Sequence, residues 1–229
     1  MISGGSTGIG AAVARQLLDE GYRLSLGVRQ PDVVSAGFAD AADRVLVSRF
    51  DATVPADAAA WLDRTLERFG GVDVLVNNAG MLKPLSFRDG DETVLDETFE
   101  VNVKAPFRMI RACLPHLARC GHGRIVNIAS TDAKRYREPV SIAYAATKHA
   151  LLAVSHAAKF EGWEAGIRVT AVCPGAVDTD FVATAPGTTP KSERISPETI
   201  ADAVSFILRL PNNAAMSEMI INSRLESTL

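Results

Sequence analysis

Short apolar runs alternate with amphipathic segments along the whole of this 229-residue chain. The runs are rich in β-branched residues, as is typical of strands buried on both faces of a parallel sheet, and the segments between them repeat apolar residues at helical spacing. This alternation predicts a doubly wound parallel sheet with helices on both faces, in three α/β/α layers. We predict strands at residues 23–28, 44–50, 73–76, 124–129, 167–173 and 219–221.

The predicted helices fall between these strands. The longest contains Pro106 and Pro115, and because proline disrupts a helix interior we expect a kink or break there. Ser196 followed by Pro197 is typical of a capped helix start. No linker, repeat or low-complexity run marks a second domain, so we expect one domain over residues 1–229. The predicted helices are residues 9–20, 57–69, 91–119 and 141–164, with a further helix that begins at Ser196.

The composition argues against several classes of function. The net charge is −3, whereas a nucleic-acid-binding surface needs a basic stripe. The sequence contains no run of 18 or more apolar residues, which is the length needed to span a membrane. Glycines interrupt the apolar core that an N-terminal signal peptide needs. Cys113, Cys120 and Cys173 fit neither a disulfide framework nor a metal-ligand spacing, and the four histidines form no metal pattern. We therefore expect a cytoplasmic protein without a metal and without a nucleic-acid or membrane partner.

A glycine-rich turn opens the chain and leads directly into the first predicted helix. Gly4, Gly8 and Gly10 leave room for a pyrophosphate, which backbone N–H groups and the positive end of the helix would hold. Their spacing differs from the common one-then-two pattern of dinucleotide-binding turns, and a tight turn with a close helix–strand contact is the alternative. The candidate phosphate-binding residues are Gly4, Ser6, Thr7, Gly8, Ile9 and Gly10.

Arg29 directly follows the strand at residues 23–28, where dinucleotide folds read the adenosine ribose. An acidic residue there would bind the 2′-hydroxyl of NAD, whereas Arg29 could pair with the 2′-phosphate of NADP. We therefore favour NADP(H), with NAD(H) still possible. Asp32 lies close by in sequence, and a solvated surface arginine is the alternative.

Tyr144 and Lys148 lie four residues apart in a predicted helix and so share one face. A nearby ammonium would lower the pKa of Tyr144 from about 10 and make the phenol a usable acid and base, although such pairs also occur by chance. Ser130 follows the strand at residues 124–129, at the edge where open α/β sheets bind ligands. Asn102 lies inside the longest helix, where Asn is disfavoured, and is either a satisfied polar group or a site residue.

Together these motifs resemble the short-chain dehydrogenase/reductase family, from Ser3 to about Ile221. Asn102, Ser130, Tyr144 and Lys148 match its catalytic tetrad in order and spacing. Residues 77–80 resemble its Asn-Asn-Ala-Gly signature, and Pro174 with Gly175 resembles its Pro-Gly segment. The residues that the resemblance places against the cofactor, besides the glycine turn and Arg29, are Asp51, Asn78, Ala79, Gly80, Tyr144, Lys148, Pro174, Gly175, Val177 and Thr179.

The resemblance implies a Rossmann-type fold and an oxidoreductase that moves a hydride between a nicotinamide and a carbonyl or alcohol. Tyr144 would protonate the carbonyl oxygen, and Ser130 would hydrogen-bond the same atom. Lys148 would bind the nicotinamide ribose and lower the pKa of Tyr144, and Asn102 would hold a water in a proton relay. An arginine at the position of Arg29 goes with NADP(H) in this family.

The chain departs from the family pattern in three places. Only residues 1–3 precede the glycine turn, so the central first strand is almost absent and we expect a weakened sheet. The C-terminal residues 220–226, with the helix start at Ser196, look more like the NADP-dependent hydroxy-acid and serine dehydrogenase branch. The segment between Thr179 and Ser196 is short, which predicts a small lid at residues 183–190.

Three functions remain open. We favour an NADP-dependent carbonyl reductase or alcohol dehydrogenase, and a 3-oxoacyl reductase is a second enzymatic possibility. A non-catalytic nucleotide-binding sensor is the third, since fold alone never fixes function, although the intact tetrad argues against it.

The sequence does not identify the small-molecule substrate. Its pocket should be lined by residues 81–84, 132–137 and 183–190. Lys134, Arg135 and Arg137 could steer an anionic substrate, although exposed charges are more often simply solvated.

We also expect a homodimer or homotetramer, as is common in the family. The contact would involve the predicted helices at residues 91–119 and 141–164. Candidate contact residues, which could equally be core residues, are Ala150, Leu151, Leu152 and Phe160.

Overall fold

Seven parallel strands form one sheet in the computed structural model of the protein, which describes residues 1–88, 90–136, 141–181 and 189–224. The strand order is β3-β2-β1-β4-β5-β6-β7, so the chain winds outward in two directions from the junction of β1 and β4. This is the doubly wound Rossmann-type topology that the sequence predicts. The strands are β1 (Ile2–Ser3), β2 (Leu24–Val28), β3 (Val45–Arg49), β4 (Val74–Asn77), β5 (Arg124–Ile128), β6 (Arg168–Pro174) and β7 (Glu218–Ile221).

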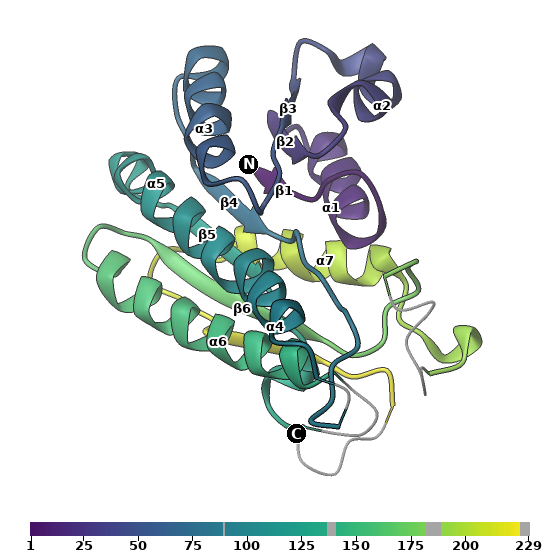
Figure 1. The fold of residues 1–229 in the computed structure, drawn as a ribbon. Coiled ribbons are helices and arrows are strands. Elements are labelled where there is room, and N and C mark those ends of the chain that lie inside the picture. Colours follow the sequence, from purple (N-terminus) through teal and green to yellow (C-terminus); the bar gives the residue numbers. More distant parts are fainter. Residues whose placement is uncertain (89, 137–140, 182–188, 225–229) are drawn as a thin grey trace.

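Helices cover both faces of the sheet (Figure 1). The face with α1 and α7 is sealed by apolar side chains of these helices against β1, β2, β4, β5 and β6, and the face with α3, α5 and α6 carries a second apolar cluster around Trp61. The helices are α1 (Gly8–Asp19), α2 (Pro31–Ser35), α3 (Pro55–Phe69), α4 (Glu92–Phe99), α5 (Ala105–Cys120), α6 (Ile142–Gly162) and α7 (Pro197–Leu208).

The predicted helix positions are confirmed with small shifts at their ends, and Ser196 caps α7 by accepting a hydrogen bond from the Thr199 N–H. The prediction missed α2 and the 3₁₀ turn at residues 36–41 that follows it. Both are too short to show an amphipathic repeat, so Pro31 was the available signal for a helix start. In the part of the chain that the structure describes, no helix is long and apolar enough to cross a membrane.

The long helix predicted at residues 91–119 is interrupted, but not in the way expected. A π-helical segment at residues 100–104 joins α4 to α5, and it lies just before Pro106. Proline has no N–H to donate to the preceding turn, which favours a widened turn at this place. Pro115 lies inside α5 without ending it, so the expected interruption of the long helix falls near Pro106.

The short first strand is nevertheless fully integrated into the centre of the sheet. Ile2 and Ser3 pair with β2 on one side and with β4 on the other. The Val76 N–H also donates to the Met1 carbonyl (2.8 Å), which extends the ladder with β4 by one bond. A two-residue strand suffices here because the longer strands β2 and β4 pair with it on both sides and fix its position.

Leu151 and Leu152, expected as oligomer contacts, lie in a buried cluster between α6, β5 and β6. They are core residues of this chain. Phe160, on the same helix, is 88% exposed. Among the proposed contact residues, Phe160 is therefore the large apolar side chain that faces solvent.

Gly27 in β2 is a packing constraint of the face that carries α3. A Cβ at this position would lie 2.7 Å from the ring of Trp61, which is fully buried. The indole N–H of Trp61 donates to Ser25 Oγ (2.8 Å), so the ring cannot move away without losing a buried hydrogen bond.

We predict that Gly27→Ala lowers the free energy of unfolding by about 1–3 kcal/mol, because overpacking forces the Trp61 ring or the strand to shift. Urea unfolding followed by circular dichroism measures this change. Gly37→Ala is the matched control, since a Cβ at Gly37 meets nothing within 4 Å. Equal stability of the two variants would contradict the packing argument.

Candidate active site

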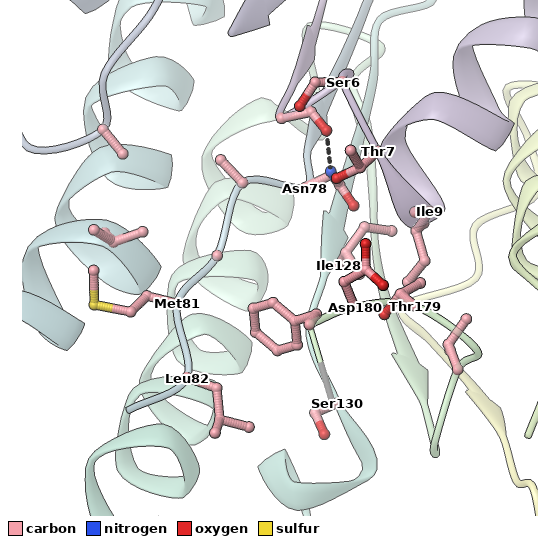
Figure 2. A pocket seen from close by; sticks show the side chains of 18 of the residues that line it. Ser6, Thr7, Ile9, Asn78, Met81, Leu82, Ile128, Ser130, Thr179 and Asp180 are labelled. Carbon is pink, nitrogen blue, oxygen red and sulfur yellow. Dashed lines mark hydrogen bonds between the residues drawn. The ribbon is translucent and has the colours of Figure 1, made fainter. Parts of the chain in front are cut away.

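A cavity of about 570 Å³ opens at the carboxyl edge of the sheet, beside the junction of β1 and β4. Its volume is in the range of small-molecule and cofactor sites. Figure 2 shows Ser6 and Thr7 at one end of the view and Ser130 at the other, with Met81 and Leu82 on one side and Thr179 and Asp180 opposite. The lining includes all but two of the predicted site residues: Gly4, Ser6, Thr7, Gly8, Ile9, Arg29, Asp51, Asn78, Ala79, Gly80, Ser130, Tyr144, Lys148, Pro174, Gly175, Val177 and Thr179.

Gly10 and Asn102 are the two predicted residues that do not line this cavity. Gly10 is buried beneath the turn, where a Cβ would lie 2.2 Å from the Gly4 carbonyl oxygen. Its role is thus the close packing of helix α1 on the turn. Asn102 lies on the π segment between α4 and α5 and contacts the site through Met81.

The glycine turn is held in place by hydrogen bonds to the end of β4. The Asn78 side-chain amide donates to the carbonyls of Ser3 (3.1 Å) and Gly4 (3.0 Å), and a hydrogen bond at Asn78 is drawn in Figure 2. In return, Ser3 Oγ accepts from the N–H groups of Asn78 (3.0 Å) and Ala79 (3.1 Å). Sequence reasoning missed Ser3, because a serine beside a glycine-rich turn carries no distinctive pattern.

The amino end of α1 fits a bound phosphate group. The first N–H groups of a helix lack partners within the helix, and Thr7 at the N-cap makes no side-chain capping bond to them. Gly4 and Gly8 have positive φ angles of 70° and 54°, which turn the backbone over the cavity. A Cβ on Gly8 would lie 2.9 Å from the Thr179 methyl group, so a side chain there would close the turn against the opposite wall.

The other end of the nucleotide region is charged. Arg29 and Asp51 follow β2 and β3 and both line the cavity. Asp51 Oδ1 accepts hydrogen bonds from the N–H (3.0 Å) and Oγ1 (2.7 Å) of Thr53, and these bonds lower the pKa of Asp51. Arg29 is exposed, so its guanidinium group is accessible to a ligand.

Tyr144, Ser130 and Lys148 converge on the same wall of the cavity. Tyr144 is 8% exposed, and burial raises the pKa of its phenol above the usual value, while a hydrogen bond with Ser130 acts in the opposite direction. Lys148 Nζ lies 5.5 Å from the centre of the Tyr144 ring. Burial thus raises the pKa of Tyr144, whereas we expected Lys148 to lower it, and in this environment the phenol holds its proton at neutral pH.

The ammonium group of Lys148 is buried (4% exposed) and donates to the Ile128 carbonyl oxygen (2.8 Å). Burial lowers the pKa of Lys148 to about 8. Gly80 leaves space beside this group, since a Cβ there would lie 3.8 Å from Lys148 Nζ. Lys148 therefore lies beside a gap at Gly80 in the lining of the cavity.

The Asn102 side chain is fully engaged as a donor. Its amide nitrogen donates to the Met81 carbonyl (2.9 Å) and to Thr147 Oγ1 (3.0 Å), and its oxygen accepts from the Met81 N–H (2.7 Å). These bonds fix the segment after β4 to the helix that carries Tyr144 and Lys148. The water-holding role expected for Asn102 stays a prediction, and its side chain has no further N–H to give to it.

The predicted catalytic and cofactor-binding residues do not include Asp180 and Phe181. Phe181 lines the cavity, and its ring centre lies 6.0 Å from that of Tyr144. Asp180 lines it too. Asp180 and Phe181 are the two residues after Thr179, the last residue of the family segment that the sequence analysis recognised. The expected lid at residues 183–190 lies largely outside the described residues, and so does Arg137.

The expected steering charges are only partly available. Lys134 Nζ forms an ion pair with Glu218 (2.8 Å) across to β7. Its charge is thereby neutralised, which argues against a role in attracting an anionic substrate. Arg135 is partly buried and has interaction partners of its own.

The short chain dehydrogenase family model matches residues 1–189, and the chain therefore belongs to this family of NAD(P)-dependent oxidoreductases. It is 37% identical over 215 residues to agropine synthesis reductase of Rhizobium rhizogenes, covering 93% of this chain and 50% of that protein. The chain thus spans about half the length of this relative. It is 34% identical over 187 residues to D-beta-hydroxybutyrate dehydrogenase of Rhizobium meliloti, covering 80% of this chain and 72% of the relative.

Solved structures give the same answer for the fold. An alcohol dehydrogenase from the archaeon Thermococcus sibiricus, complexed with 5-hydroxy-NADP, is 33% identical, with a TM-score of 0.88 over 98% of this chain and 97% of that one. A 3-ketoacyl-(acyl-carrier-protein) reductase from Brucella melitensis, complexed with NADH, is 28% identical, with a TM-score of 0.87 over 97% and 95% of the two chains. The two relatives bind different nicotinamide cofactors, so likeness alone leaves the choice between them open.

We predict a pH dependence of stability that is specific to Lys148. Its pKa is about 8 in the fold and about 10.4 in an unfolded chain, so between these values the unfolded state binds more protons and stability rises with pH. Relative to Lys148→Met, the wild-type protein should gain about 3 kcal/mol from pH 7 to pH 11. Chemical unfolding of both proteins across this range measures the difference. A constant difference would contradict a lowered pKa.

Proposed function

We propose that the protein is an NADP-dependent oxidoreductase that interconverts a ketone or aldehyde and the corresponding alcohol. The convergence of Ser130, Tyr144 and Lys148 on one wall of a cavity that also contains the glycine turn carries this proposal. In that cavity the cofactor would supply or accept the hydride, and the protein would supply geometry and proton transfer.

Proton transfer is the task of Tyr144. Because burial raises its pKa, the phenol is protonated at neutral pH and can donate to the developing alkoxide of a carbonyl substrate. Ser130 hydrogen-bonds the phenol and can donate to the same substrate oxygen. Lys148, beside the gap at Gly80, would hold the ribose hydroxyls, and its positive charge would favour the phenolate after the proton has left.

NADP(H) is the proposed cofactor because of Arg29. An exposed guanidinium group after β2 offers a bidentate partner to a 2′-phosphate. Asp51, which lies on the neighbouring strand end and whose pKa is lowered, is oriented by Thr53 and would contact the adenine rather than the ribose.

The proposed substrate is defined by its broad chemical class. Similarity to D-beta-hydroxybutyrate dehydrogenase favours the hydroxy-acid branch, and similarity to the 3-ketoacyl reductase favours an oxoacyl substrate. The neutralised Lys134 removes one expected anion contact, and Met81, Leu82 and Phe181 are apolar residues of the cavity lining. We therefore favour a carbonyl compound with an apolar substituent, and a non-catalytic sensor remains the alternative from another class.

A homo-oligomer is proposed as well. Phe107 on α5 and Phe160 on α6 are 51% and 88% exposed, and α5 packs beside α6. Large exposed aromatic side chains on adjacent helices are typical of a contact surface between chains.

We predict that Tyr144→Phe lowers kcat by about 10²–10⁴-fold while cofactor affinity is retained, because only the proton-transfer group is lost. Steady-state kinetics with a panel of ketones and NADPH, with fluorescence titration of the cofactor, measures both quantities. A non-catalytic sensor would show no turnover, either as the wild-type protein or as the Tyr144→Phe variant. Unchanged turnover in the variant would exclude Tyr144 as the proton donor.

We predict that Arg29→Ala weakens NADPH binding by about 10–100-fold and leaves NADH binding unchanged, which corresponds to one charge-assisted contact with the 2′-phosphate. Nicotinamide fluorescence titration gives both dissociation constants. Arg23→Ala, at the opposite end of the same strand region, is the control. Equal losses for the two cofactors would reduce Arg29 to a surface charge.

We predict that Phe160→Glu shifts the protein toward the monomer, because it places a charge on the proposed contact surface. Light scattering coupled to size-exclusion chromatography measures the mass. Val33→Glu, at a 73% exposed position on α2, is the control and should leave the mass unchanged. A monomeric wild-type protein would contradict the proposed assembly.

A further inference from the structure

Three potential metal ligands meet at the edge of the sheet opposite to the cavity. Asp73 directly precedes β4, Cys120 is the last residue of α5, and His122 lies two residues before β5. One ligand atom from each lies within 4.8 Å of the other two. Asp73 and His122 are exposed and Cys120 is partly buried, so the group is accessible from solvent.

We propose that Asp73, Cys120 and His122 form a binding site for a borderline-soft divalent transition-metal ion of the zinc type. Thiolate, imidazole and carboxylate are the three ligand types that Zn²⁺ takes in proteins, and thiolate disfavours Mg²⁺ and Ca²⁺. Three protein ligands leave a fourth tetrahedral position for water or another ligand. The short spacing of Cys120 and His122 did not reveal this site in the sequence, because the third ligand arrives from a different strand.

The backbone already holds the three residues in their places. The Arg124 N–H donates to the Asp73 carbonyl (2.9 Å), which locks the start of β5 to the start of β4. Gly121, with φ +71°, ends α5 and turns the chain so that Cys120 and His122 face the same region. The Gly121 carbonyl in turn accepts from the Asn212 side chain (3.1 Å). A metal would therefore bind without a large rearrangement of the chain.

Two backbone groups fix the position of the Cys120 sulfur. It accepts a hydrogen bond from the His122 backbone N–H, and metal ligands are generally oriented by such outer hydrogen bonds. The Cys120 thiol also donates to the Leu117 carbonyl (3.0 Å), at the negative end of the α5 dipole, and a bound metal would displace this proton. A cation at this point would meet a favourable field.

Arg124 is the main opposing charge, because its guanidinium group lies near Cys120. That group donates to the Leu210 carbonyl (2.7 Å) and the Asn212 side-chain oxygen (2.9 Å), and also to the carbonyls of His122 and Gly123 (both 3.1 Å). The thiolate and the Asp73 carboxylate together carry two negative charges, which balance a divalent cation. The site is therefore close to neutral once loaded.

The effect of binding should be on stability rather than on turnover. The site joins the end of α5 to β4 and β5 at their amino ends, whereas the cavity lies at their carboxyl ends. A ligand that binds the folded state alone raises its stability. We expect Zn²⁺ to raise the melting temperature of the protein.

Titration of the purified full chain with Co²⁺ in place of Zn²⁺ tests the site. We expect a thiolate-to-cobalt charge-transfer band that saturates at one ion per chain. Zn²⁺ should displace the cobalt and remove the band. Cys120→Ser should abolish the band. His122→Ala and Asp73→Asn should each weaken Co²⁺ binding by at least about 10–100-fold, which is the loss that follows removal of an outer hydrogen-bond partner of a metal ligand. His116→Ala, one turn earlier on α5, is the matched control and should bind normally.

Several outcomes would overturn the proposal. They are the absence of the band in the wild-type protein, its persistence in Cys120→Ser, or its loss in His116→Ala. Circular dichroism of each variant checks that it is folded. Alkylation of the wild-type protein gives a second readout that needs no variant: Zn²⁺ should protect Cys120, and an unchanged rate of modification would also contradict the site.

Discussion

The position of the glycine turn relative to the catalytic residues depends on one reciprocal set of hydrogen bonds, between Ser3 at the end of β1 and Asn78 at the end of β4. A two-residue strand has little ladder of its own, so its end would be poorly fixed without them. Through these bonds the turn and the segment after β4 move as one unit. The Asn102 side chain then ties that segment, at Met81, to α6. The glycine turn, the segment after β4 and the helix that carries Tyr144 are thereby joined by a series of partly buried and buried polar contacts.

Burial has a cost at this site. Tyr144 and Lys148 are both almost completely enclosed, and enclosure disfavours the charged form of each. The phenol is thus held as a proton donor, and the ammonium group is stabilised by a single carbonyl at 2.8 Å. Folding alone would favour apolar residues at both positions. Their presence beside a cavity is better understood as a requirement of the chemistry than as a contribution to stability.

Much of the fold could be predicted from sequence because the buried strands and amphipathic helices follow simple periodicities. The glycine turn, Ser130, Tyr144 and Lys148 could also be recognised, since their local context of strand end or helix face is encoded within a few residues. Ser3 could not, because its importance arises from residues some seventy positions away. The pKa of Tyr144 was expected to fall and instead rises, since its largest cause is burial, which depends on the whole fold. The π segment likewise had no sequence signal beyond Pro106.

The π segment also explains how the nearly continuous helix formed by α4 and α5 packs against different neighbours along its length. Upstream of it α4 packs against α6, and downstream α5 packs against α3, β4 and β5 in addition to α6. One additional residue in a turn advances the side-chain phase by about 100° relative to an uninterrupted helix. The apolar stripe can therefore turn from one packing partner to another without an intervening loop, while the regular helical register is interrupted at the π segment. Any natural or engineered change in length between Glu100 and Lys104 would rotate the helix upstream of the segment against the helix downstream of it.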